Sequence, residues 1–560
     1  MKKLPLGISD FKTLIEEDRY FVDKSLFIKE IIDADDKISL IPRPRRFGKT
    51  LNLSMLRYFY EAPLPNSSQS DSPHLFKKLK IWQAGDEYIN KYRKYPVIFL
   101  TFKDVKNTNW EKCYLGIKNV IIKEFKRHSY LLNADLDNFD KIYINKIISE
   151  AGTEIDYQNS LKYLSEILFN HYGANPVILI DEYDMPIQAG FNNGYYSEVI
   201  EFIRNLLSGA FKDNQFLERG VLTGILRIAK ESIFSGLNNI EVCSIVSKKY
   251  SDKFGFLENE VFELFEYKQI DYNKNEITEW YNGYKFGKYE IYNPWSILKF
   301  ASNDGEFGLY WINTSSNDLV KELMADADKE TKNELEDLLN GKEIEKVIDD
   351  NIVYAEVKNN AETVWNFLFF SGYLKIISSR YKNRRKYYKL VIPNNEILYF
   401  FENTVQDWLI RSEANLNLKL LKSSLLSGKI DIFESIFTKF ALNSLSYFDV
   451  KGKEPEKFYH AFVLGSMFHL NDVYEIKSNR ESGYGRYDVM MIPKNKNNYG
   501  IIFEFKSVDK ILNETLESAV SDALKQIKEK KYRAELESMG IKNIKEIAIA
   551  FSGKDILMKY

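Results

Sequence analysis

Cysteine and histidine are scarce in this 560-residue sequence. Its two cysteines, Cys113 and Cys243, lie far apart and show no CxxC spacing. This excludes a disulfide framework and a cysteine-based zinc site, and it is typical of a reducing compartment. The five histidines are scattered and form no HExxH pattern, so that zinc motif is absent as well.

The sequence also lacks an excess of one charge and lacks long apolar runs. Its formal net charge is −2, so any nucleic-acid surface must be a local basic patch. After Lys2 and Lys3 only a short apolar stretch precedes Asp10. Neither a signal peptide nor a membrane span is expected from this pattern. We therefore expect a cytoplasmic protein with no membrane partner.

Length and composition predict a globular chain of several domains. Hydrophobic residues make up 44% of the chain and charged residues 28%, which is enough apolar material for several cores. We expect three parts. They are an α/β domain at 1–270, a helical and winged-helix-like domain at 271–400, and a helical linker with a second α/β domain at 401–560.

Four compact apolar runs predict buried strands in the first part. They are Lys37–Pro42, Pro96–Phe102, Pro176–Ile180 and Glu218–Leu226. Runs of this length suit parallel strands that are buried on both faces. Helices are expected between them, near residues 50–60, 110–127, 158–172 and 196–212. Strands that alternate with helices predict a parallel α/β sheet.

Residues 43–50 read RPRRFGKT and match the end of the phosphate-binding loop G-x-x-x-x-G-K-[ST], with Arg43 in place of the first glycine. Gly48 would let the backbone approach a phosphate, Lys49 would reach the β- and γ-phosphates, and the Thr50 hydroxyl would ligate Mg²⁺. Arg46 adds positive charge beside the loop. The tripeptide GKT also occurs by chance in long chains, but its place between a strand and a helix favours an ATP site.

Residues 176–184, PVILIDEYD, supply the second half of this predicted site. Four apolar residues followed by two acids form a Walker B pattern, in which Asp181 would hold Mg²⁺ through water and Glu182 would orient the attacking water. The alternative is a buried strand that ends in a solvated acidic turn. On the next strand, Thr223 is expected to sense the γ-phosphate. Arg227 would act as an arginine in cis, or else form a surface ion pair.

The middle of the chain combines charged helices with a basic hairpin. Residues 316–350 carry Glu, Asp and Lys at helical spacing, which predicts helices on the outside of a middle domain or, alternatively, a solvated linker helix. An apolar helix is expected from Val364. Two short strands follow around the basic run 380–386, a pattern typical of a winged helix. Arg384 and Arg385 are candidates for contacts with nucleic-acid phosphates, which would be salt-sensitive and blind to sequence. The alternative is a solvated hairpin tip.

Residues 480–506 place two carboxylates on neighbouring strands. Asp488 follows a glycine-rich turn, and the strand IIFEFK carries Glu504 and Lys506 on the face opposite Phe503 and Phe505. Charges on a buried strand are costly unless they are used. Asp488 and Glu504 would bind Mg²⁺ or Mn²⁺, and Lys506 would position a water and stabilise charge on a phosphodiester. This arrangement matches the D…ExK core of PD-(D/E)XK nucleases.

The helix that is expected after this strand carries Gln526, and Tyr532 follows it. Nucleases of this kind often have a Gln and a Tyr here, although the spacing in this sequence is looser than in the best-known variant. Gln526 is therefore a further candidate for contact with nucleic acid. Glu456 could add a further acidic group, or it could be an exposed carboxylate at a helix start.

Several segments together resemble one family. PRRFGKT, LIDEYD, LTGILRIAKESIFSGLNN, YNGYKFG with YNPWS, and SGYL…IPN occur in order over nearly the whole chain. They are similar to bacterial AAA-ATPase-like proteins that carry a C-terminal PD-(D/E)XK domain. The resemblance implies a P-loop ATPase fold, a restriction-endonuclease-like fold and the usual presence of Arg at position 43. It implies no biological role.

Three functions remain open at this point. The first is an ATP-gated nuclease that uses ATP, Mg²⁺ and nucleic acid, with DNA expected ahead of RNA. The second is a nucleotide-dependent switch or interaction protein whose nuclease fold binds nucleic acid without cutting. The third is a scaffold with two vestigial sites, against which the intact Lys49, Asp181, Asp488, Glu504 and Lys506 argue. Self-association into a homo-oligomer is compatible with each of them.

Overall fold

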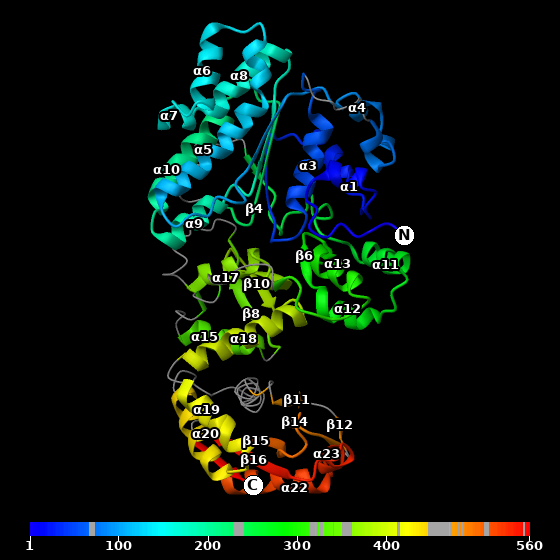
Figure 1. Cartoon of the computed structure of the whole chain (residues 1–560), viewed down its shortest axis with the longest axis vertical. Coiled ribbons are helices and arrows are strands. Elements are labelled where there is room, and N and C mark those ends of the chain that lie inside the picture. The colour runs from blue at the N-terminus through cyan, green and yellow to red at the C-terminus, as the bar shows by residue number, and fades with distance from the viewer. Residues whose placement is uncertain are drawn as a thin grey trace. The chain divides into compact units, whose positions relative to one another are not determined.

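The computed structural model describes the chain except for residues 66–72, 228–239, 313–319, 321–322, 325–328, 340, 350–360, 412–414, 446–469, 471–472, 479–480, 483–484, 509–513 and 553–554. The chain divides into two compact units (Figure 1). The first is Met1–Leu323 with Glu345–Ile397, and the second is Met324–Ile344 with Leu398–Tyr560. The three-part division expected from the sequence stays a prediction.

A five-stranded parallel sheet forms the centre of the first unit. Its strands are β1 (Ile38–Pro42), β2 (Val97–Thr101), β3 (Val177–Asp181), β4 (Arg219–Gly224) and β5 (Ile240–Val242), in the order β2-β3-β4-β1-β5. The first four are the predicted apolar runs, and β1 and β3 are buried along their whole length. The predicted parallel α/β sheet is thus confirmed.

Helices fill the connections between these strands. The predicted helices appear as α3 (Lys49–Tyr60), α5 (Trp110–Arg127), α8 (Ser160–Tyr172) and α10 (Tyr196–Phe211). In Figure 1, α5, α8 and α10 lie on one side of the sheet, and α3 lies on the other. The remaining helices of this unit are α1 (Phe11–Glu16), α2 (Leu26–Asp33), α4 (Asp86–Ile89), α6 (Asn138–Ile148), α7 (Glu154–Gln158), α9 (Met185–Asn193), α11 (Glu258–Lys268), α12 (Lys274–Tyr281), α13 (Pro294–Ser302) and α17 (Ala361–Phe370). Among the helices that the structure describes, none has the length and apolar character needed to cross a membrane.

The middle of the chain is mixed in structure. β6 (Tyr284–Phe286) and β7 (Tyr289–Ile291) form one hairpin. β9 (Lys375–Lys382) and β10 (Arg385–Val391) form the predicted basic hairpin after α17. The expectation of helices through residues 316–350 is right for α15 (Lys329–Leu339) and wrong for β8 (Ile344–Val347). β8 is a strand because it pairs with β10 at the edge of a three-stranded sheet, a long-range contact that helical spacing cannot reveal.

The second unit contains a mixed sheet of β11 (Tyr474–Ser478), β14 (Val489–Pro493), β15 (Gly500–Ser507), β16 (Ile544–Ser552) and β17 (Asp555–Lys559), in that order. Only the β15–β16 pair is parallel among these described strands. Two very short strands, β12 (Glu481–Ser482) and β13 (Gly485–Arg486), pair beside the sheet. Besides α15, the helices described in this unit are α18 (Asn395–Arg411), which begins in the first unit, α19 (Asn415–Leu426), α20 (Ile430–Leu445), α22 (Leu516–Glu529) and α23 (Arg533–Ser538).

The alternation predicted for β15 decides which side chains face which helices. Phe503 and Phe505 belong to the core that contains Phe433 of α20, whereas Ile502 belongs to the core that contains Ile527 of α22. The sheet is therefore covered on both faces, and the side of Ile502 is the side that Glu504 shares.

Candidate functional site

The loop between β1 and α3 has the geometry of a phosphate-binding loop. Gly48 caps α3 with a φ of 83°, a left-handed conformation that glycine adopts without strain. Lys49 is only 4% exposed, and its Nζ donates to the carbonyls of Arg43 and Pro44, both at 3.1 Å. Burial lowers the pKa of Lys49, while the carboxylates of Glu182 and Asp181 act against this shift. The ammonium group is thus held beside the backbone of the loop and close to the acids of β3.

Asp181 ends β3 and collects hydroxyl donors from three other segments. Thr50 donates to its Oδ2 at 2.8 Å, Thr101 to the same oxygen at 3.3 Å, and Thr223 to Oδ1 at 2.8 Å. Asp181 is fully buried, and burial raises its pKa, with Glu182 adding to the effect. The carboxyl ends of parallel strands meet at one edge of a sheet, which brings the predicted Asp181 and Thr223 together with Thr101, a residue that the sequence analysis did not single out. A carboxylate and a hydroxyl are oxygen ligands that suit Mg²⁺.

Arg46 and Glu182 are placed by unusual backbone conformations. Both have positive φ, 68° and 50°, which residues with a Cβ adopt only at a cost of about 1 kcal/mol or more. The Arg46 guanidinium lies over the Trp295 ring, 4.5 Å from its centroid. Burial lowers the pKa of Arg46, and Glu182 acts against this shift. The strained backbone thus directs opposite charges to the same region beside Lys49.

Arg43, which replaces the first glycine of the loop motif, is buried in the protein and does not line the cavity beside the loop. Its side chain is fully buried, and Nη1 donates to the carbonyls of Pro42 (2.8 Å) and Cys243 (2.6 Å). Its guanidinium also lies 5.0 Å from the centroid of the Phe254 ring. Burial lowers its pKa to about 10. Arg43 therefore ties the start of the loop to the residues after β5, an anchoring role that the sequence did not show.

Asp184 is a second residue that the sequence analysis missed. It is buried, and its Oδ2 accepts hydrogen bonds from the backbone of Ile225 (2.8 Å) and Leu226 (3.0 Å). Burial raises its pKa to about 6. Asp184 thus fixes the backbone after β4, directly before Arg227. The only sequence signal was the third acid of the pattern DEYD.

The segments whose motifs suggested the family resemblance gather around the phosphate-binding loop. Trp311 Nε1 donates to the Arg45 carbonyl at 3.0 Å, and Asn293 of YNPWS donates to the same carbonyl at 3.4 Å. Gly372 of SGYL has a φ of 92°, and a Cβ added there would lie 3.1 Å from the Pro44 Cβ. Glycine is therefore needed at this close approach.

Glu396 holds the segments that contact the loop. It follows the IPN motif, is 1% exposed, and accepts hydrogen bonds from the Trp311 backbone N–H and from Ser296 Oγ. Burial raises its pKa to about 7. The carboxylate thereby connects α13, Trp311 and the start of α18 behind the loop.

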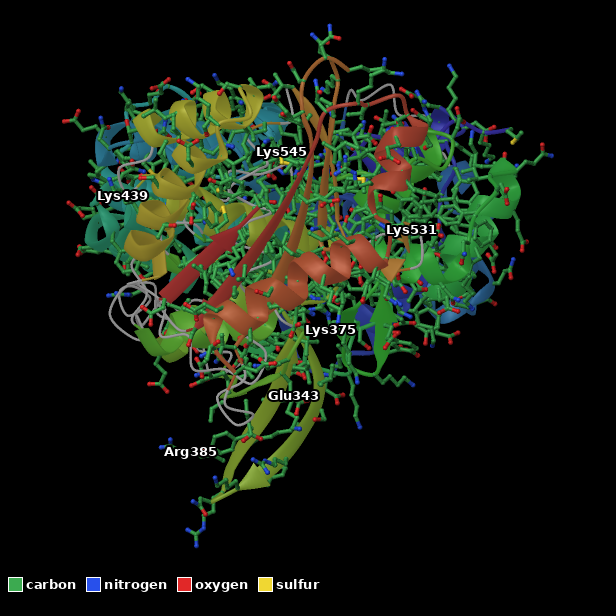
Figure 2. The ribbon with its side chains drawn as sticks, turned by 90° about the horizontal axis from the view of Figure 1, so that it is seen from below. Glu343, Lys375, Arg385, Lys439, Lys531 and Lys545 are labelled. Atoms are coloured by element: carbon green, nitrogen blue, oxygen red, sulfur yellow. The ribbon has the colours of Figure 1, made fainter. Side chains whose placement is uncertain are left out.

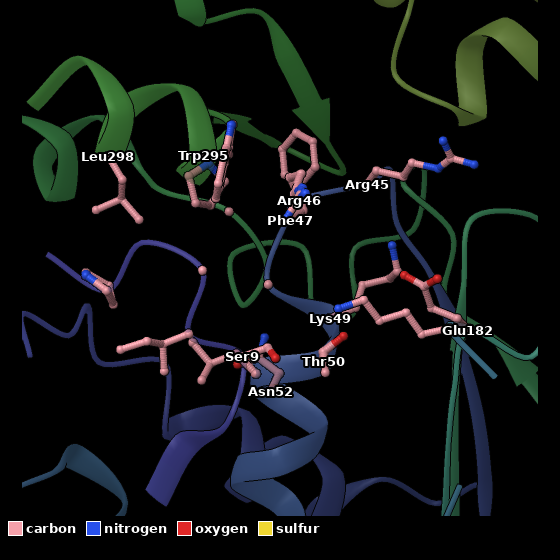
Figure 3. Close-up of a pocket in the computed structure, with 18 of the residues that line it drawn as sticks. Ser9, Arg45, Arg46, Phe47, Lys49, Thr50, Asn52, Glu182, Trp295 and Leu298 are labelled. Carbon is pink, nitrogen blue, oxygen red and sulfur yellow. The ribbon is translucent and has the colours of Figure 1, made fainter. Parts of the chain in front are cut away.

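A cavity of about 580 Å³ opens beside the loop. Lys49, Thr50 and Glu182 lie at one end, and Trp295 and Leu298 lie at the other (Figure 3). Among the described residues, neither Thr223 nor Arg227 lines this cavity. Thr223 acts on Asp181 instead, and the role of Arg227 stays a prediction. Residues 228–239, which include the whole AKESIFSGLNN segment, lie outside the described part of the chain.

The second unit brings the predicted nuclease residues together. The register between β14 and β15 pairs Val489 with Phe503, so Asp488 stands opposite Glu504 on one face of the sheet. Asp488 Oδ2 accepts a hydrogen bond of 2.8 Å from the backbone N–H of Phe505. Glu504 is 2% exposed. A carboxylate buried to this degree is costly unless other groups hold it.

α22 supplies the group that holds Glu504. Gln526 Nε2 donates to Glu504 Oε1 and lies 3.4 Å from the hydroxyl of Tyr532. The pKa of Tyr532 is raised by burial, and the charges of Glu504 and Asp488 add to this. Lys506 follows on β15 and is partly exposed. The loose sequence spacing of Gln526 and Tyr532 therefore still brings both side chains to the acidic pair.

The donors present suit a hard divalent ion. Asp488 and Glu504 offer carboxylate oxygens, the ligands that Mg²⁺ and Mn²⁺ prefer. In the part of the chain that the structure describes, no group of three or more His, Cys, Asp and Glu side chains is placed to hold a metal. A bound ion would thus need further oxygen ligands from the backbone, water or substrate. Glu456, the proposed extra acid, lies outside the described residues.

The nucleic-acid candidates Arg384 and Arg385 lie at the turn of the β9–β10 hairpin. Arg384 is the second residue of the two-residue loop, and Arg385 begins β10 opposite Lys382. Both are exposed. They belong to the first unit.

Comparisons with known proteins match the two regions of the chain that carry these residues. Residues 5–234 match the AAA-ATPase-like family, described as a predicted AAA-ATPase, and residues 454–560 match the PD-(D/E)XK nuclease superfamily. An uncharacterized protein in the vnfD 5′ region of Azotobacter chroococcum mcd 1 is 25% identical over 548 residues, which cover 95% of this chain and 94% of that protein. Residues 5–234 are therefore an AAA-ATPase-like domain, and residues 454–560 are a C-terminal PD-(D/E)XK nuclease-superfamily domain.

Proposed function

We propose that this chain is an ATP-gated nuclease. The first unit binds and hydrolyses ATP with Mg²⁺, and its nucleotide state controls metal-dependent cleavage of nucleic acid by the second unit. DNA is the expected substrate in preference to RNA. One observation carries the proposal. Each unit buries one carboxylate on its sheet, Asp181 in the first unit and Glu504 in the second. Hydrogen-bond donors from neighbouring segments hold each of them. Burial of such a charge is costly and is typical of functional sites.

The cavity of the first unit suits a nucleoside triphosphate. Its volume of about 580 Å³ lies within the range of small-molecule sites. Lys49 and the start of α3 offer positive charge and backbone N–H groups to phosphates, while Trp295 and Leu298 offer apolar surface to a base. Thr50 and Asp181 would hold Mg²⁺, which neutralises phosphate charge when bound. Glu182 would orient the attacking water.

The second unit suits hydrolysis of a phosphodiester. Asp488 and Glu504 would hold Mg²⁺ or Mn²⁺, which polarises a phosphoryl oxygen when bound. In this reaction a water molecule gives up a proton as its oxygen bonds to phosphorus. The bond from phosphorus to the leaving sugar oxygen breaks, and the sugar oxygen takes up a proton. Lys506 positions the water and offsets the charge that develops on the phosphate. Gln526 fixes the orientation of Glu504.

The test is a cleavage assay with the full chain. Plasmid DNA, single-stranded DNA and RNA are incubated with Mg²⁺ or Mn²⁺ and with ATP, ADP, a non-hydrolysable ATP analogue or no nucleotide. We expect cleavage whose rate depends on the nucleotide. Lys49→Ala should remove this dependence and weaken ATP binding at least about tenfold. Lys112→Ala, a change at an exposed position on α5, is the matched control.

The outcomes separate the candidate functions. Cleavage that ignores nucleotide would retain the nuclease and contradict the gating. ATP-dependent binding of nucleic acid without any cleavage would replace the proposal with the nucleotide-dependent switch. If Lys49→Ala bound ATP as tightly as the wild type and its cleavage still depended on the nucleotide, the proposed nucleotide site would be refuted.

A further inference from the structure

The β9–β10 hairpin concentrates positive charge that the rest of the chain does not share. Residues 375–391 contain seven lysines and arginines and no acid, although the whole chain carries a net charge of −2. Arg380 forms an ion pair with Glu345 of β8. Among the described residues, Lys382, Arg384 and Arg385 have no ion-pair partner. Glu345 also attracts Lys382 at longer range, but one carboxylate does not balance the positive charges of this hairpin.

This end of the hairpin is exposed on both faces. Every residue from 377 to 385 is exposed, and the Tyr381 side chain is 77% exposed. Figure 2 shows Arg385 towards the free end of the hairpin and Lys375 at its root. Successive residues of a strand point to opposite faces, so Lys382 and its partner Arg385 stand on one face and Lys386, the partner of Tyr381, stands on the other. β8 has four residues and β10 has seven, so part of β10 pairs with β9 alone, and a two-stranded ribbon gains little stability of its own.

Two features of the hairpin work against its stability. Arg385 stands directly opposite Lys382, and like charges in that position repel. The two turn residues, Asn383 and Arg384, both have positive φ, 50° and 64°. A two-residue turn of this kind favours Asn-Gly, and here an arginine takes the position where glycine would be free of strain. The exposed tip thus combines a strained turn backbone with two like charges that repel each other. Such unfavourable features at one place indicate a binding function.

We propose that the β9–β10 hairpin is a nucleic-acid-binding element that grips the phosphate backbone of duplex DNA with Lys382, Arg384 and Arg385. The end of the hairpin fits a duplex groove, where Lys382 and Arg385 on one face, Lys386 on the other and Arg384 at the turn can each meet a phosphate, whereas a flat anionic surface would meet one face or the tip. The contact is independent of sequence. The inference goes beyond the proposed function, because the hairpin belongs to the first unit and binds whether or not the second unit cuts.

The test measures binding of the full chain to a fluorescent DNA duplex in EDTA, from 50 to 200 mM NaCl. Arg384→Gln/Arg385→Gln should weaken binding at least about fivefold and reduce the slope of log K against log[salt] by about 1.8, because each phosphate that the protein no longer neutralises accounts for about 0.9. The control is Lys112→Gln/Lys123→Gln, which removes the same charge from exposed positions on α5. It should change neither quantity.

Arg384→Gly distinguishes binding from a structural role. It should weaken DNA binding while leaving thermal stability unchanged or raised, because glycine relieves the turn. The proposal would be overturned if Arg384→Gln/Arg385→Gln bound DNA with the affinity and salt slope of the wild type. An equally large effect in Lys112→Gln/Lys123→Gln would overturn it as well. Hairpin-dependent binding to phosphatidylserine vesicles with unchanged DNA binding would assign the surface to membranes and also overturn it. Binding without cleavage in Mg²⁺ would contradict the proposed nuclease but support this element.

Discussion

Thr223, near the end of β4, donates a 2.8 Å hydrogen bond to Asp181 at the end of the adjacent strand β3. The bond links the position predicted to sense the γ-phosphate to the carboxylate predicted to hold Mg²⁺. It is fully buried, so its strength is not reduced by competition with water. Thr223 therefore acts through Asp181, and the two side chains form one unit with Thr50.

Replacement of Thr223 by valine removes this hydroxyl while keeping the shape of the side chain. The loss of a buried hydrogen bond to a carboxylate should lower the stability of the first unit by about 1.5–3 kcal/mol. Affinity for ATP with Mg²⁺ should fall more than affinity for ATP in EDTA, measured by calorimetry. Thr101→Val, which removes a longer bond of 3.3 Å to Asp181, should cost less. Equal affinities in wild type and Thr223→Val would contradict a role at the metal.

Glu182→Gln should separate binding of ATP from its hydrolysis. The amide keeps the size of the side chain but cannot take a proton from water, so turnover should fall about 100-fold or more while ATP affinity changes little. Steady-state phosphate release and equilibrium ATP binding measure the two effects. Glu201→Gln at an exposed position on α10 is the control. Full turnover in Glu182→Gln would remove Glu182 from the reaction.

Asp488→Ala and Glu504→Ala should each abolish nucleic-acid cleavage, and the double variant should be no worse than either. This non-additivity is expected because the two carboxylates act as one unit. Lys506→Ala should lower the cleavage rate but keep metal binding, since a charged lysine has no lone pair to offer the ion. All variants should bind ATP as wild type does. Glu529→Ala on the exposed face of α22 is the control, and cleavage that survives in Asp488→Ala would disprove this site.

Glu396 should make the stability of the first unit depend on pH. Its pKa is raised to about 7 by burial, whereas the unfolded chain has an ordinary glutamate pKa of about 4.3. The native state therefore keeps a proton that the unfolded state loses, so stability should fall as pH rises from about 4.3 to about 7 and then level off.

Glu396→Gln should flatten this pH dependence, because its side chain stays uncharged and still accepts from the backbone of Trp311 and Ile312. Thermal unfolding of both proteins between pH 5 and pH 8 gives the comparison, and the difference between wild type and variant isolates Glu396 from other groups. The same pH slope in both proteins would mean that Glu396 titrates normally.

The local patterns of the sequence determined most of the elements. Apolar runs predicted β1 to β4 because a strand buried on both faces must be apolar along its length. The period of two in IIFEFK predicted that Glu504 and Phe505 face opposite cores, because side chains alternate along any strand. The motifs also predicted which residues meet, since the carboxyl ends of parallel strands share one edge.

The tertiary structure alone decided what those patterns leave undetermined. Arg43 showed in the sequence only as a departure from the loop motif, yet its side chain is buried and donates to the carbonyl of Cys243, 200 positions away in the chain. Ile344–Val347 has helical spacing of charges but forms a strand because β10 lies beside it. Asp184 and Glu396 are acidic residues like many others until burial raises their pKa values. Burial and partners far along the chain exist only once the chain has folded, so no local pattern can carry them.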